Sequence, residues 1–214
     1  MRRQPGMFRR ALVLCAAAGI GITIFPQRAP ATIAEQRARL PPPAECTDPV
    51  AGVWKSHQHD PTWGDWYIFT LNIQRVAGDD HALTGTIQAH SWSGGPDDEE
   101  PPACRPGLSH WTVMMTATGT HQDDHRIHFG GTSWSPENAF CGAAPGPGQY
   151  NLDQFNGQID PALQEFQSVN NDGGRAVNVP TVFRRVSCHE APPAPHVNPV
   201  PPPFFPKRSG CSLF

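Results

Sequence analysis

The stretch DWYIFTLNIQRVAGDDHALTGTIQAHSW, residues 65–92, contains the pattern that decides the fold. Apolar or small residues occupy every second position of 67–73, and the alternation resumes in 83–89 after the turn AGDDH. Alternation with a period of two on both sides of a Gly/Asp turn is typical of a β-hairpin that buries one face. An antiparallel hairpin is therefore predicted at the centre of the domain.

The position of each turn predicts which residues face one another across a hairpin. In the first hairpin, Leu71 is expected opposite Ile87 on the apolar face. The same reasoning applied to the hairpin at 109–134 places Met115 opposite Phe129. Both registers bring apolar side chains together on one side of the sheet.

Eight segments with this alternation predict an all-β fold: 51–56, 65–76, 82–92, 109–119, 125–134, 150–160, 164–170 and 179–188. In an up-and-down meander, successive connections alternate between the two ends. Every long connection then falls at one end, the mouth, and every tight turn at the other end, the base. We therefore expect an eight-stranded antiparallel up-and-down barrel, which removes exposed sheet edges. A two-sheet sandwich is the alternative.

The N-terminal segment has the composition of a signal peptide. Four arginines precede the apolar run 11–25, and Ala29-Pro30-Ala31 fits a small-x-small cleavage site. The apolar run is short of the roughly 20 residues that a membrane-spanning helix needs. We expect residues 1–31 to be removed and the protein to be periplasmic or secreted, by the general or the twin-arginine route. An uncleaved leader is the alternative, and would be the one attachment to a membrane.

Proline-rich stretches frame a single domain. The segment 32–45 ends in three consecutive prolines, and the segment 191–214 is also rich in proline. Such segments favour extended polyproline structure and do not build a core. We therefore expect a linker at 32–45, a barrel domain at 46–190 and a tail at 191–214, with both Pro-rich ends disordered.

The charge balance argues against several partners. The chain has 16 Lys and Arg and 19 Asp and Glu. The leader holds five of the arginines and no acid, so the mature chain carries 11 basic and 19 acidic residues, a net charge of −8. Nucleic acids and anionic lipid surfaces bind basic patches, so neither is expected as a partner.

The cysteines provide a test of the topology. Of the six, one lies in the leader. In a closed meander the first and last strands are neighbours, so Cys46 and Cys188 should meet at the base, while Cys104 and Cys141 lie in two mouth loops. We predict the disulfides Cys46–Cys188 and Cys104–Cys141, each stabilising the fold by roughly 2–4 kcal/mol. Cys211 is left as a free thiol or for an intermolecular bridge.

A Gly-x-Trp sequence, Gly52 to Trp54, opens the first predicted strand, and LTGT at 83–86 lies in the third. Together with an up-and-down barrel, these features resemble the calycins, the group of lipocalins, fatty-acid-binding proteins and avidins. The resemblance implies that the tryptophan closes the barrel base and that a basic residue of the last strand, Arg184 or Arg185, packs across it. A guanidinium stacked on an indole gains cation–π attraction.

Five aromatic and histidine residues near the mouth are candidate ligand contacts. Trp66, Trp92 and Trp134 are predicted on the polar outer face, where indoles can form a flat platform for a sugar ring or an apolar ligand. The alternative is packing beneath the long loops or the N-terminal linker. His57 and His59 share one side of an extended loop, where with Asp60 they could contribute metal ligands. The alternative is a solvated loop. We assign no metal site, because no paired Cys or Glu with ligand spacing accompanies them.

The predicted function is binding without a cofactor. We expect an exported protein that holds a small apolar molecule or a glycan at the open end of the barrel. The alternative is an envelope interaction or inhibitor module with a filled barrel and a protein partner. A lumen cavity of several hundred Å³ would favour the first. No nucleophile elbow, phosphate loop, Cys–His signature or acid pair points to catalysis. A metal-dependent enzyme at the histidines is the third and weakest alternative.

Overall fold

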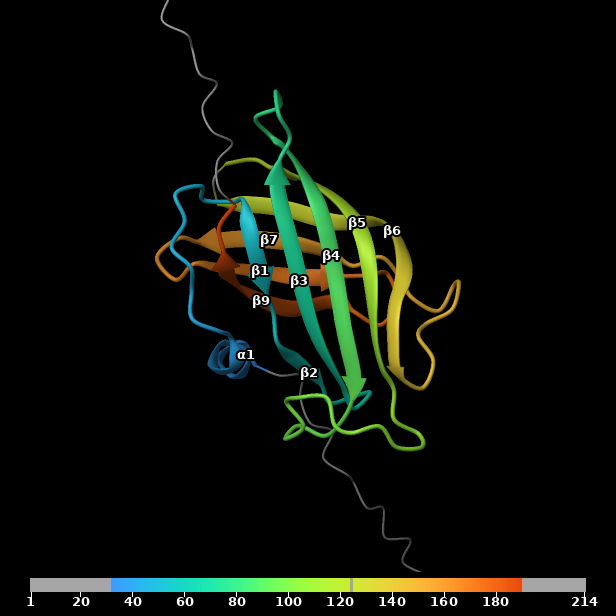
Figure 1. Ribbon diagram of the computed structural model, residues 1–214. Helices are drawn as coiled ribbons and strands as arrows, with labels where there is room; N and C mark the ends of the chain where they lie inside the picture. Colours follow the sequence, from blue (N-terminus) through green and yellow to red (C-terminus); the bar gives the residue numbers. More distant parts are fainter. Residues whose placement is uncertain (1–31, 124, 190–214) are drawn as a thin grey trace, which may run out of the picture.

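The stretch 65–92 forms the predicted hairpin, and the sheet extends outward from it (Figure 1). β3 (Asp65–Arg75) and β4 (Ala82–Ser93) pair along their length, with Leu71 opposite Ile87 as predicted. This computed structural model describes residues 32–123 and 125–189. The predicted signal peptide, the Pro-rich tail and Cys211 lie outside the described residues.

The remaining strands follow in chain order around a closed barrel. Neighbours pair antiparallel, and β1 pairs with both β9 and β3, which closes the sheet. The predicted eight-stranded antiparallel barrel is therefore confirmed, with one extra strand: β1 forms the first predicted strand, and β2 forms within the connection expected after it and also pairs with β3. These strands are β1 (Gly52–Lys55), β2 (Gln58–Asp60), β5 (His110–His121), β6 (Arg126–Cys141), β7 (Gln154–Asp160), β8 (Glu165–Asn171) and β9 (Val177–Ser187).

Two long loops lie at the mouth, at 94–109 and 142–153. The other two predicted mouth loops are shorter than expected. β2 takes up part of the first, and β9 begins early enough to reduce the last to 172–176. The prediction that all four mouth connections are long is therefore wrong for two of them, because strand pairing extends further than the sequence pattern indicated.

The register of β6 differs from the prediction. Met115 lies opposite Trp134 instead of Phe129, and the strand continues to its disulfide cysteine. The turn between β5 and β6 is displaced toward the C-terminus, and there the Asp123 carboxylate accepts the backbone N–H groups of His125 and Arg126 at 2.9 and 2.8 Å. An Asp in this position stabilises a tight turn, and β5 can therefore run further before the chain reverses.

A bulge in β6 also changes the orientation of Trp134. The register shifts between Thr116 and Ala117, which places one extra residue in β6. An extra residue reverses the inward and outward alternation beyond it. Trp134 consequently packs against the hydrophobic core. Its predicted position on the outer polar face is wrong, because period-two counting does not detect a bulge.

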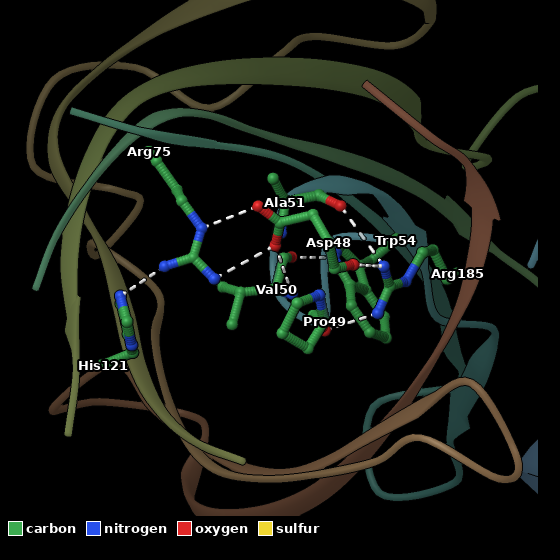
Figure 2. A network of polar contacts seen from close by, with 8 residues as sticks. All are labelled: Asp48, Pro49, Val50, Ala51, Trp54, Arg75, His121 and Arg185. Carbon is green, nitrogen blue, oxygen red and sulfur yellow. Dashed lines mark hydrogen bonds and ion pairs between the residues drawn. The ribbon is translucent and has the colours of Figure 1, made fainter. Parts of the chain in front are cut away.

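Trp54 and Arg185 meet at the base of the barrel (Figure 2). The Arg185 guanidinium carbon lies 4.4 Å from the centre of the Trp54 ring, and both side chains are fully buried. Arg184, the other candidate, points away from the lumen and pairs with Glu165 at 2.7 Å. Gly52 allows this packing, because a Cβ there would lie 2.7 Å from a backbone carbonyl oxygen of β9.

A polar network holds the turn 48–51 across the base (Figure 2). Arg185 donates hydrogen bonds to three carbonyl oxygens of this turn. The Asp48 carboxylate accepts from Arg75 at 2.7 Å, and Arg75 also contacts His121 at 2.7 Å. Burial alone would raise the pKa of the Asp48 carboxyl, but the hydrogen bonds from Arg75 and from two backbone N–H groups outweigh it and lower the pKa to about 2.

The helix α1 (Ile33–Arg39) forms within the segment that the sequence analysis treated as a linker. Thr32 and Glu35 form a capping box at its N-terminus. Gln36 is buried and bonds two backbone groups of β9 at 2.9 Å each. The helix therefore packs on the barrel wall as part of the domain. Within residues 32–123 and 125–189, no helix has the length and apolar character needed to cross a membrane.

Both predicted disulfides are confirmed. Cys46–Cys188 joins the segment before β1 to the end of β9, and Cys104–Cys141 joins a mouth loop to the end of β6. The Cα atoms are 5.5 Å apart in each pair. Two disulfides in one domain are consistent with an oxidising environment such as the periplasm or the extracellular space.

Candidate functional site

The lumen is filled at the base and open toward the mouth. Its lower half is packed with the aromatic side chains Phe69, Phe155, Phe166 and Phe183. Above them lies a cavity of about 650 Å³. Its walls are formed by β2, the first residues of β3 and β5, and the connections 142–153 and 172–176. This volume is within the range of pockets for small organic ligands.

Aromatic rings form one wall of the cavity. Tyr67 and Trp111, with ring centres 6.5 Å apart, come from the inward faces of β3 and β5. Tyr150, from the loop before β7, lies edge-on to Trp111 at 5.6 Å and contacts Trp134 at the same distance. Trp134 therefore supports the cavity wall from behind instead of forming an outer platform.

A buried carboxylate lies among the cavity residues. The Tyr150 hydroxyl donates to Asp153 Oδ2 at 2.6 Å, and the Asn170 amide donates to Asp153 Oδ1 at 2.6 Å. The Asn170 oxygen accepts the backbone N–H of Gln154, which fixes the orientation of the amide. Asp153 is only 3% exposed. Two neutral donors thus hold one carboxyl group in a fixed position at the edge of the cavity.

Burial controls the protonation of this group. Desolvation raises the pKa of Asp153 to about 7, even though the hydrogen bonds from Tyr150 and Asn170 act to lower it. Burial also raises the pKa of the Tyr150 hydroxyl well above its usual value. A carboxyl group that titrates near neutral pH inside a cavity is typical of functional sites.

The rim of the cavity is formed by a contact between two loops. Arg175 pairs with Asp65 at 2.9 Å. Its guanidinium carbon also lies 4.4 Å from the centre of the Trp63 ring. Trp63 is 60% exposed, an unusual state for a large aromatic side chain. These three residues therefore form the outer edge of the entrance.

The predicted outer pair, Trp66 and Trp92, is present but covered. The two indoles lie opposite each other as predicted and stack with ring centres 6.0 Å apart. Both are fully buried. Each ring N–H donates to a carbonyl oxygen of the mouth loop, that of Gly95 at 2.8 Å and that of Asp98 at 2.9 Å. This is the alternative arrangement, packing beneath a long loop, and it leaves no open indole face.

His57 and His59 belong to the same outer cluster. Their rings lie 5.2 and 4.9 Å from the Trp66 ring, and each Nε2 is 3.1 Å from a carbonyl oxygen of the 94–99 segment. Burial lowers the pKa of His57. The two histidines therefore fix the mouth loop in place. Among the residues that the structure describes, no three His, Cys, Asp or Glu side chains gather in a metal-binding arrangement.

Of the five predicted ligand contacts, His59 alone also lines the cavity. Asp153, Tyr150 and Asn170 were not predicted as site residues. One signal was present: in the strand predicted at 150–160, Asp153 has the same parity as Phe155 and Ile159, which places an acid on an apolar face. Asn170 likewise shares the parity of Phe166. A polar residue on the buried face of a strand needs a partner or a function, and these two are partners of each other.

No family model, curated protein or solved structure matches this chain.

Proposed function

We propose that this protein is an exported, calycin-like binding protein that holds a small ligand in the mouth cavity. The observation that carries the proposal is the open upper lumen above a closed and filled base. A rigid barrel that leaves about 650 Å³ free is a preformed site, so little conformational entropy is lost on binding. The two disulfides and the N-terminal sequence support export.

The resemblance to calycins is supported by the arrangement of the base. A Gly-x-Trp strand, a cation–π contact from the last strand and a closed meander occur together here, as that resemblance implies. One wall of the cavity is aromatic, which suits an apolar ligand or the apolar face of a sugar ring. An inhibitor module with a filled barrel is less well supported, because the upper lumen is open.

A cavity-filling variant tests the proposal. Ala144 lines the cavity and is partly buried against the core, so Ala144→Trp should occupy the ligand space. Ala162→Trp adds the same side chain at an exposed base turn and is the matched control. We expect N-phenyl-1-naphthylamine, a neutral fluorescent probe, to bind saturably to the wild-type protein and to Ala162→Trp but not to Ala144→Trp. Absence of saturable binding to the wild type, or equal binding to all three, would overturn the proposal.

A further inference from the structure

The charged groups that line the cavity are unbalanced. Four carboxylates line it, those of Asp60, Asp65, Asp153 and Asp172, whereas Arg175 is the one lysine or arginine among the described lining residues. Arg175 is engaged by Asp65 at 2.9 Å. The other three acids have no ion-pair partner in the described part of the chain. The cavity therefore has a negative potential that the protein does not neutralise.

Asp153 is the deepest of these acids and the most restricted. Its two oxygens are held at 2.6 Å by Tyr150 and Asn170, both of which are uncharged donors. Asp60 and Asp172, by contrast, accept backbone N–H groups within their own loops, at 2.9 and 2.6 Å. A buried carboxylate without a cation is costly, and a cationic ligand group removes much of that cost.

The aromatic wall suits the same ligand. Tyr67, Trp111 and Tyr150 line the cavity together with Asp153. The negative faces of aromatic rings attract organic cations, most strongly where water is excluded. An anionic group would instead meet an excess of acids over bases, and a neutral group would leave the Asp153 charge uncompensated above about pH 7, where this carboxyl is ionised.

From this arrangement we infer that the cavity takes a small organic cation, an amine carried on an apolar or aromatic body, with the ammonium group paired to Asp153. The inference rests on the proposed binding function and specifies its ligand class. The apolar body of the ligand occupies the space beside Trp111 and above the phenylalanines that fill the base. The rim residues Trp63 and Arg175 lie nearer the entrance than this body.

Three probes with the same ring and different charge test the inference. 2-Phenylethylamine is cationic at pH 8, 2-phenylethanol is neutral and 3-phenylpropanoate is anionic. We expect isothermal titration calorimetry on the mature wild-type chain to give an affinity for the amine at least about tenfold above that for the alcohol, and the weakest affinity for the acid. Asp153→Asn should reduce the advantage of the amine over the alcohol to within about threefold.

The matched control is Asp97→Asn, which removes the same charge from an exposed position of the mouth loop and should keep the preference for the amine. Equal affinities for amine and alcohol, or tighter binding of the acid, would overturn the cation inference and leave the cavity as a binding site. If the naphthylamine probe bound but the amine, the alcohol and the acid did not, the cation inference would also be overturned and the cavity would remain a binding site. Failure of all four probes would overturn both proposals. A near-UV circular dichroism spectrum of Asp153→Asn that matches the wild-type spectrum shows that this variant is folded.

Discussion

Arg185→Met is expected to lower the free energy of unfolding by about 3–5 kcal/mol. The Arg185 side chain is fully buried, lies over Trp54 at 4.4 Å and donates to three carbonyl oxygens of the turn 48–51. Losing a charged donor costs roughly 1.5–3 kcal/mol for each strong hydrogen bond, and the cation–π contact adds about 0.5–2 kcal/mol. Methionine restores part of the apolar volume, which keeps the loss below the simple sum of these values.

The measurement is urea unfolding, or calorimetry, with both disulfides intact. For a domain of this size, the expected loss corresponds to a fall in Tm of roughly 10 °C. Arg126→Met, at an exposed position of the base, should be nearly neutral. Arg184→Met should cost about 1 kcal/mol, because Glu165 keeps its contact with Arg37 at 2.8 Å. If Arg185→Met lay within about 1 kcal/mol of Arg126→Met, the account of the base would be refuted.

Three further predictions concern the cavity acid, the disulfides and the outer cluster. Because the pKa of Asp153 is raised to about 7 in the folded state from its usual 3.8, the folded protein binds this proton more tightly than the unfolded chain. The contribution of Asp153 to stability should therefore fall as pH rises from about 4 to 7, by up to about 4 kcal/mol. Urea unfolding of Asp153→Asn and wild type across this range should show the mutant gaining relative stability with pH, and parallel curves would contradict the prediction. Replacing the Cys46–Cys188 pair by serines should lower the free energy of unfolding by about 3–5 kcal/mol. This loss should exceed that for the Cys104–Cys141 pair, because the first disulfide closes a loop of 142 residues and the second a loop of 37. Equal losses of stability in calorimetry would contradict this prediction. Trp92→Phe removes the N–H that the Asp98 carbonyl accepts and should lower the free energy of unfolding in urea by about 1–2 kcal/mol. The affinity of the cavity for the naphthylamine probe should not change. A weakened affinity would mean that the outer cluster contributes to the site.

The sequence by itself determined the barrel and its closure. Alternation in 65–92 identified the buried face, and the turn gave the register of Leu71 and Ile87. Strand order followed from the alternation of long connections and tight turns, and the order in turn predicted both cysteine pairs. These features depend on local periodicity and on chain connectivity, and both can be determined from the sequence alone.

The tertiary structure alone decided where a ligand can bind. The bulge in β6 turned Trp134 inward, the 94–109 loop covered Trp66 and Trp92, and α1 joined the barrel wall. The pattern of a strand shows which side chains face the lumen, but not how far they fill it. Free volume inside a barrel depends on how side chains from distant strands pack together. For that reason the cavity beside Asp153 became visible only in three dimensions.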